Sequence, residues 1–276
     1  MWKDGYLVGN ELIDNQHKEL FVIIRNLLLT LKDASDKAEY KKSLIDAIVF
    51  LKGYVVQHFT DEENYMENKN FKGLELHKRF HEELTNDVLF YEKQLVDSDF
   101  SIPIVKKFLG FVNVWLIQHV AGEDQQFSDN YIQKEISNDI VSQTCDVIKM
   151  MTNYDPGDVT VYRENYMPEG SNLCFRVGLS GDIKKAIGLV FSDRFTAAVF
   201  KAMTSMDLVE QDEFVVSAMS EIGNMIAGRI APIVGGKPSV AAETPVQTDA
   251  GAFPAEREVT YLRTAIGDVA VLVFGA

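Results

Sequence analysis

Cysteines and long apolar runs are scarce in this chain. The two cysteines, Cys145 and Cys174, do not form a CxxC pair, so we expect reduced thiols and no disulfide framework. No uninterrupted apolar stretch approaches the roughly 18 residues of a membrane span, and the N-terminal segment lacks the basic and apolar regions of a signal peptide. These absences predict a cytoplasmic protein that has no membrane partner.

Clustered positive charge is also missing. The 276 residues carry a formal net charge of −14, whereas a surface that neutralises phosphates needs grouped lysines and arginines. The sequence therefore predicts no nucleic-acid partner. A chain of this length fits one large domain or two ordinary domains, and we expect two.

Histidine is rare as well, yet its distribution is informative. All five histidines lie in the first 119 residues, each on the apolar stripe of an expected helix: His17, His58, His77, His81 and His119. A single buried histidine is ordinarily satisfied by a hydrogen bond. Five of five at inward positions favour a metal site inside a helical bundle.

Four expected helices carry these histidines. Apolar residues recur every three or four positions over 13–31, from about 37 to 65, and over 74–95. A fourth helix opens near Ser101 and Pro103, an expected N-cap and an early helical proline, and reaches His119. Short connections between long helices predict an all-α, up-down four-helix bundle.

Two carboxylates accompany the histidines. Glu62 continues the inward stripe four residues after His58, and an unpaired carboxylate at such a buried position costs several kcal/mol unless a cation or a proton compensates it. Helical periodicity favours Glu123 as the second inward carboxylate, because it follows His119 by four residues. Five imidazoles and two carboxylates are too many ligands for one zinc ion and too rich in nitrogen for magnesium or calcium. Two iron ions with an oxo or hydroxo bridge fit the set and leave one position for dioxygen.

These residues resemble the bacterial hemerythrins over about residues 1–128. The matching segments are IDNQHKEL, HFTDEENYM, HKRFH and WLIQHVAGED. The resemblance implies reversible dioxygen binding at a pair of iron ions, and it selects Asp124 rather than Glu123. It assigns three histidines to one iron, two to the other and two carboxylates as bridges: His77, His81 and His119; His17 and His58; Glu62 and Asp124.

The pattern changes after residue 128. An amphipathic helix is expected over 131–153, and two more helices near 195–203 and 213–233. Between and after them lie β-rich runs at 159–162, 173–179, 187–191, 259–262 and 269–274. Such a mixture predicts an α+β domain over 131–276, after a bundle domain over 1–128.

A polar stripe crosses the expected helix over 213–233. Ser217, Glu221, Asn224 and Gly228 recur at offsets of four, three and four, so they share one face of an otherwise apolar helix. An ordinary solvated face explains most such short motifs. Asparagine and glycine both lower helix propensity, which favours a use for them here.

The segment SAMSEIGNMIAG and the elements around it resemble the CheX branch of the CheC-type chemotaxis phosphatases, over about residues 131–276. The resemblance implies a CheY-like response regulator as partner and magnesium that arrives with the phosphorylated regulator. Asn224 is then expected to orient water toward the aspartyl phosphate, and Glu221 to hold a lysine of the partner. Such catalysis depends mainly on positioning. The same resemblance implies a homodimer through the C-terminal domain.

The combination predicts an oxygen or redox sensor that dephosphorylates a CheY-type regulator. From Glu123 to Tyr154 the chain has no glycine or proline, so we expect the fourth helix to run almost directly into the next one. Two other interpretations stay open. The chain is alternatively an oxygen carrier or scavenger whose C-terminal domain only binds a partner or dimerises, or a di-iron oxidase or peroxidase, which the imidazole-rich ligand set disfavours.

Overall fold

The structure, a computed structural model, describes residues 2–33, 37–128, 139–152, 154, 159–162, 167–170, 172–181 and 183–275. The chain divides into two compact units, Met1–Gln133 and Lys134–Ala276, which we call unit 1 and unit 2. Within the described residues, no helix is long and apolar enough to cross a membrane. Each unit is considered separately below.

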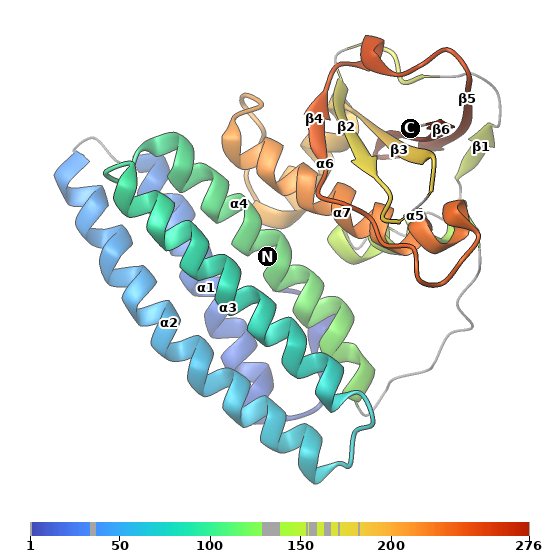
Figure 1. Cartoon of the computed structure of the whole chain (residues 1–276). Coiled ribbons are helices and arrows are strands. Elements are labelled where there is room, and N and C mark those ends of the chain that lie inside the picture. Colours follow the sequence, from blue (N-terminus) through green and yellow to red (C-terminus); the bar gives the residue numbers. More distant parts are fainter. Residues whose placement is uncertain are drawn as a thin grey trace. The chain divides into compact units, whose positions relative to one another are not determined.

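Unit 1 contains four long helices that form a bundle (Figure 1). They are α1 (Glu11–Asp33), α2 (Lys37–Asn68), α3 (Leu74–Asp97) and α4 (Ile102–Gln118). Helices α1 and α3 each pack against both α2 and α4, as the apolar stripes predict for an up-down bundle. Ser101 precedes α4 in extended conformation with Pro103 in the first turn, but its side chain makes no capping hydrogen bond.

Polar side chains fix the start of unit 1. Asn10 Oδ1 accepts the N–H groups of Leu12 and Ile13, which caps α1. The buried Asp14 carboxylate accepts the N–H groups of Val8 and Gly9 at 2.7 and 3.2 Å, so the segment before the helix is held against its first turn. His17 lies three residues after Asp14 on the same helix. The contacts of Asp14 therefore also fix the position of His17 along the bundle axis.

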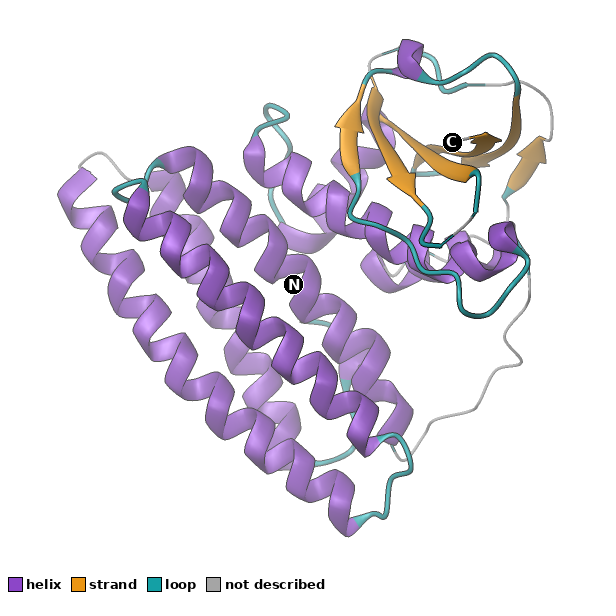
Figure 2. Cartoon of the chain, viewed as in Figure 1, coloured by secondary structure: helices purple, strands orange, loops and turns teal. Residues whose placement is uncertain are grey.

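Unit 2 is built on one antiparallel sheet with three helices (Figure 2). The strand order is β1-β5-β6-β3-β2-β4. The strands are β1 (Thr160–Tyr162), β2 (Asn172–Gly178), β3 (Lys185–Ser192), β4 (Val246–Thr248), β5 (Arg257–Thr264) and β6 (Gly267–Gly275). The helices are α5 (Ile140–Thr152), α6 (Asp193–Thr204) and α7 (Glu213–Gly235). The short edge strand β4 has no counterpart among the strands expected from the sequence.

Both faces of the sheet are buried. On one face α7 packs against β2 and β3, α6 against β3 and β6, and α5 against β5. The other face carries a second apolar cluster that includes Val190 and Leu272 and is covered by Phe253, Tyr162 and Met167. Cys174 belongs to this second cluster, and both cysteines are free thiols. The result is the α+β architecture that the mixed pattern predicts.

The junction differs from the expected continuous helix. The last helical turn of unit 1 ends at Phe127, because Ser128 adopts an extended backbone. At the start of α5, which spans Ile140–Thr152, the Asp139 carboxylate accepts the N–H of Ser142 at 2.9 Å. The expected helical residues 131–138 lie outside the described residues.

Candidate metal centre and candidate phosphatase site

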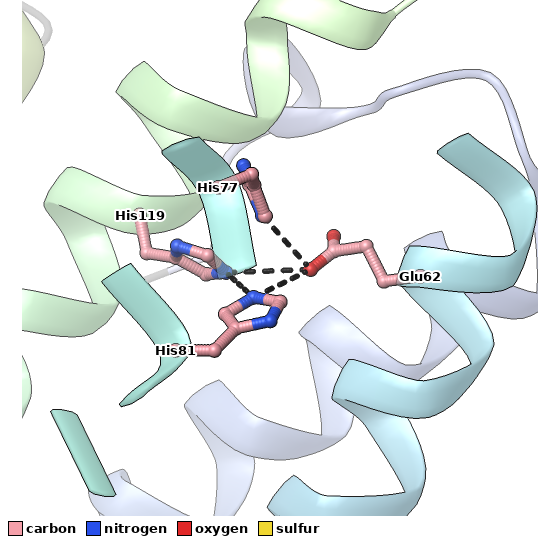
Figure 3. A group of neighbouring side chains, drawn as sticks. All are labelled: Glu62, His77, His81 and His119. Carbon is pink, nitrogen blue, oxygen red and sulfur yellow. Dashed lines mark hydrogen bonds and ion pairs between the residues drawn. The ribbon is translucent and has the colours of Figure 1, made fainter. Parts of the chain in front are cut away.

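All seven expected ligands converge on one point inside unit 1. His17 comes from α1, His58 and Glu62 from α2, His77 and His81 from α3, and the chain just after α4 supplies His119 and Asp124. Each is at most 3 % exposed. Figure 3 shows four of them, with three histidine rings gathered around the Glu62 carboxylate.

The Nε2 atoms of the histidines point at the carboxylates. Glu62 Oε2 lies 3.4, 3.2 and 3.4 Å from the Nε2 atoms of His77, His81 and His119. The other oxygen, Oε1, lies 3.5 Å from His17 Nε2, and His58 Nε2 is 3.9 Å from Oε2. Glu62 thus lies between a group of three histidines and a group of two.

Asp124 completes the cluster from the opposite side. Its Oδ2 lies 3.2 Å from His17 Nε2, and its Oδ1 lies 3.5 and 3.3 Å from the Nε2 atoms of His77 and His119. Both carboxylates therefore contact histidines of both groups. A carboxylate placed in this way can reach a cation held by either group.

A π-helical turn places Asp124 in the cluster. The segment His119–Glu123 is one π turn, in which the Asp124 N–H donates to the His119 carbonyl five residues earlier. Residues five apart then lie above one another, whereas α-helical spacing would have aligned Glu123 with His119. Glu123 instead accepts a hydrogen bond from Gln126 Nε2 at 2.8 Å. The periodicity-based expectation of an inward Glu123 is wrong for this reason.

The π turn is held by two neighbours. Gln125 Nε2 donates to the Val120 carbonyl at 3.0 Å and to the Tyr6 carbonyl at 3.2 Å, which satisfies a carbonyl within the π turn. Phe127 anchors the following 3-10 turn in a small apolar cluster with Val8 and Met66. The position of Asp124 is therefore fixed from both ends.

Residues that the sequence analysis did not select orient the histidine rings. His58 Nδ1 lies 3.1 Å from Gln16 Oε1, and His81 Nδ1 lies 2.8 Å from Glu63 Oε1. An acceptor at Nδ1 places the proton there and leaves Nε2 free to ligate. Gln16 and Glu63 are the sequence neighbours of the expected ligands His17 and Glu62. A search of the sequence for polar residues next to the ligands could therefore have found both.

Aromatic rings pack on two of the ligands. The ring of Phe59 stacks on His81 with centroids 3.6 Å apart and planes 5° apart. Trp115 stacks on His119 at 4.5 Å and 20°. These contacts restrict the rings to one orientation and keep water from that side of the cluster.

Burial and mutual charges shift the pKa values within the cluster in opposite directions. Burial lowers the pKa of His17, but the nearby carboxylates of Asp124 and Glu62 outweigh burial and raise it to about 9. For His58 burial dominates and lowers the pKa to about 4. Burial and the Glu62 charge raise the pKa of Asp124 to about 7, whereas the histidines around Glu62 hold its pKa well below the usual range despite burial. The negative charges of Glu62 and Asp124 thus repel each other, and a bound cation relieves that repulsion.

The donor set fits metal ions on geometric grounds as well. Buried cluster atoms that make no hydrogen bond include His17 Nε2, His58 Nε2, Glu62 Oε1 and both carboxylate oxygens of Asp124. Leaving so many buried polar atoms unpaired is costly, and all of them are ligand atoms for a transition metal. Seven ligands exceed what one zinc ion takes and suit a pair of metal ions with nitrogen and carboxylate ligation.

The second candidate site lies on α7. Asp212 caps this helix by accepting the N–H groups of Phe214 and Val215, and Gly236 ends it in left-handed conformation. The buried side of α7 faces the sheet, where Gly223 approaches Leu189 closely. Asn224 is exposed and Glu221 is half-buried, so the polar stripe faces away from the sheet. Asn224 is therefore accessible on the outer face of α7.

Known protein families match segments in both halves of the chain. The chain matches the hemerythrin HHE cation binding domain over residues 8–129 and the chemotaxis phosphatase CheX over residues 173–261. It is 32% identical over 129 residues to a bacteriohemerythrin of Clostridium acetobutylicum, covering 47% of this chain and 98% of that protein. A myohemerythrin of Riftia pachyptila is 27% identical over 130 residues, 47% of this chain and 92% of that protein.

A solved structure resembles unit 2. The chemotaxis protein CheX of Desulfovibrio desulfuricans aligns with a TM-score of 0.38 and 22% identity, over 50% of this chain and 96% of that one. Through its N-terminal half this chain belongs to the hemerythrin family, and residues 173–261 of its C-terminal half match the chemotaxis phosphatase CheX.

Proposed function

We propose that the protein is an oxygen or redox sensor in chemotaxis, in which unit 1 binds dioxygen at two iron ions and unit 2 dephosphorylates a CheY-type response regulator. One observation carries the proposal above all others. Five histidine Nε2 atoms and two carboxylates, all buried, meet at one point in a domain of the hemerythrin family.

The residues of unit 1 hold and shield the metal pair. His77, His81 and His119 would hold one iron, His17 and His58 would hold the other, and two carboxylates would serve both: Glu62 and Asp124. When bound, the iron pair supplies the electrons and the open coordination position for a reversible interaction with dioxygen. The chain orients the ligands and keeps water away from them. Gln16 and Glu63 fix the rings of His58 and His81, and the burial of the ligands excludes bulk water.

The residues of unit 2 act by positioning. Asn224 orients a water molecule in line with the aspartyl phosphate of the regulator, and Glu221 holds a lysine of that partner. The water oxygen forms a bond to phosphorus as the bond to the aspartyl oxygen breaks, which releases inorganic phosphate and the free carboxylate. Magnesium enters with the regulator. The exposure of Asn224 on a helix fixed against a sheet supports this role.

Metal analysis with optical spectra under argon and under air tests the first half. We expect two iron ions per chain and a reversible colour change on exposure to air. A stable oxygenated spectrum distinguishes binding from oxidase or peroxidase chemistry, in which the spectrum decays as substrate is consumed. Fewer than two retained iron ions, or no colour change, contradicts the assignment of unit 1.

Single-turnover dephosphorylation of a phosphorylated CheY-type regulator tests the second half. We expect Asn224→Ala to slow the reaction about 100-fold, because the water loses its positioning group. Gln247→Ala, which removes an exposed carboxamide from strand β4 instead of from α7, is the matched control. Equal rates for wild type and Asn224→Ala leave unit 2 as a binding or dimerisation module, and the protein as an oxygen carrier or scavenger.

A change of iron state is expected to alter the dephosphorylation rate, since His119 and Asp124 belong to the last helical turns of unit 1. The rate is compared for the metal-free, diferrous, oxygenated and diferric protein. Identical rates in all four states remove the sensory role and leave two independent activities. The CheX resemblance also supports a homodimer through unit 2, which sedimentation analysis of the full chain tests.

A further inference from the structure

A cavity of about 110 Å³ lies inside unit 1 beside the metal centre. All four helices line it, with Ile24 from α1, Leu51 and Val55 from α2, Leu84 from α3, and Val112 and Trp115 from α4. At its inner end it borders the imidazoles of His58 and His119. Apart from these two rings, Lys52 and Thr85 are the polar residues in its lining. The cavity is thus an apolar compartment that adjoins the cluster.

The outer end of the cavity lies between α2 and α3. Its lining there includes Val56 and Leu89, which are 66% and 50% exposed. Lys52 also lines it and pairs with Glu92 across the two helices, with Lys52 Nζ 2.8 Å from Glu92 Oε2. An apolar passage therefore leads from the surface of the bundle, beside this ion pair, to the rings of His58 and His119.

The chemistry of the lining decides what the cavity holds. A buried water needs two to four polar partners, and the walls between the entrance and the histidines offer almost none. Apolar cavities of comparable size, about 150 Å³, stay dry and bind benzene or xenon. A charged or strongly hydrogen-bonding molecule would lose its hydration without compensation. The volume exceeds what a diatomic gas requires.

We propose that this cavity binds a small uncharged hydrocarbon, up to about the size of benzene, at a site distinct from the metal-coordinating atoms. The occupant lies against Trp115 and between the entrance and His58. It therefore restricts the access of dioxygen to the cluster. The binding itself is independent of the proposed function, whereas the effect on dioxygen rests on it.

Trp115 offers a direct readout of binding. The chain has two tryptophans, so a Trp2→Phe variant leaves Trp115 as the sole one. Benzene is titrated into the full-length reduced protein under argon while Trp115 emission is measured. We expect a saturable change with benzene and none with benzoate, which has the same ring and a charge.

Substitutions in the wall of the cavity test whether benzene binds inside it. Val112→Phe fills part of the cavity and is expected to weaken benzene binding at least tenfold. Val22→Phe makes the same change at a position of α1 that is 53% exposed and does not line the cavity, so the affinity is expected to stay unchanged. Val112→Thr is the alternative if Val112→Phe does not fold, because its hydroxyl admits water and weakens benzene binding.

The outcomes separate this inference from the proposed function. No saturable response to benzene, or equal affinity in wild type and the folded wall variants, overturns it. The fluorescence titration does not require iron, so it remains decisive even if the chain retains no metal. With iron bound, saturating benzene is expected to slow the colour change on exposure to air, and an unchanged rate overturns the effect on dioxygen access.

Discussion

The two candidate sites are built on opposite principles. In unit 1 seven ionisable side chains are buried in a helical core, where each needs a compensating partner. In unit 2 Glu221 and Asn224 lie on the outer face of one helix, with Asn224 exposed, where polar residues cost nothing. Buried polar residues therefore carry much more information about function than exposed ones. Glu221 and Asn224 acquire meaning only through a partner or a family resemblance.

The largest predicted effect concerns metal removal, which should change the folding stability of only one of the two units. An ion that binds folded unit 1 alone, at a free concentration about 1,000 times its dissociation constant, stabilises the folding of that unit by about 4 kcal/mol. Chelation is expected to lower the urea midpoint of unit 1 accordingly. Both tryptophans, Trp2 and Trp115, lie in unit 1, so their emission follows this unit.

A probe of unit 2 provides the control for metal removal. Dephosphorylation measured in increasing urea should lose activity at the same midpoint with and without chelator, since α7 contains none of the ligands. An unchanged tryptophan midpoint after chelation would show that the buried carboxylates and imidazoles compensate one another without metal.

The second prediction contrasts two adjacent carboxylates. Asp124→Ala removes a bridging group and is expected to weaken iron retention more than 100-fold, because a first ligand matters more than the roughly 10- to 100-fold effect of supporting groups. Glu123→Ala removes the acceptor of the Gln126 hydrogen bond but no ligand of the cluster, and is expected to keep both iron ions. Iron content after dialysis against a mild chelator measures the difference. Equal loss in both variants would contradict the role of the π turn.

This pair also shows where sequence reasoning ends. The apolar periodicity predicted the four helices and placed His58 and Glu62 on one face, because α-helical spacing applies throughout α2. It failed at Asp124, because one extra residue per turn in a π turn shifts every following side chain. Only the family resemblance carried that information.

The missed features of unit 2 have similar causes. Strand β4, Val246–Thr248, is too short for an alternating pattern and is defined by its pairing with β2. The break after Phe127 depends on the extended backbone of Ser128, whereas the absence of glycine and proline had allowed a continuous helix. Local patterns reveal long elements, and their ends depend on single side-chain contacts.

The third prediction tests a supporting residue of the buried site. Gln16→Ala removes the acceptor at His58 Nδ1 and is expected to weaken iron affinity about tenfold. Gln57→Ala is a close control. Gln57 Nε2 donates a hydrogen bond to the Asp61 carboxylate at 2.9 Å, as Gln16 Nε2 does at 2.7 Å, and the Gln57 side chain is exposed on α2. Competition with a chromophoric chelator measures both affinities. A tenfold loss with Gln57→Ala as well would assign the effect to Asp61 and not to the imidazole.

The smallest predicted effect concerns α7, the helix that carries Glu221 and Asn224. Asp212→Ala removes the cap of α7, which costs about 1 kcal/mol, and Asp212→Ser is expected to restore most of it. Asn224 lies about three turns further along α7, beyond the reach of a frayed first turn, so single-turnover dephosphorylation at low urea should stay within about twofold of wild type. The urea midpoint of that activity should fall in Asp212→Ala and recover in Asp212→Ser. A large loss of rate in the folded Asp212→Ala protein would instead show that the start of α7 itself contacts the regulator. The exposed site would then extend along the helix beyond Glu221 and Asn224, in contrast to the closed set of seven ligands in unit 1.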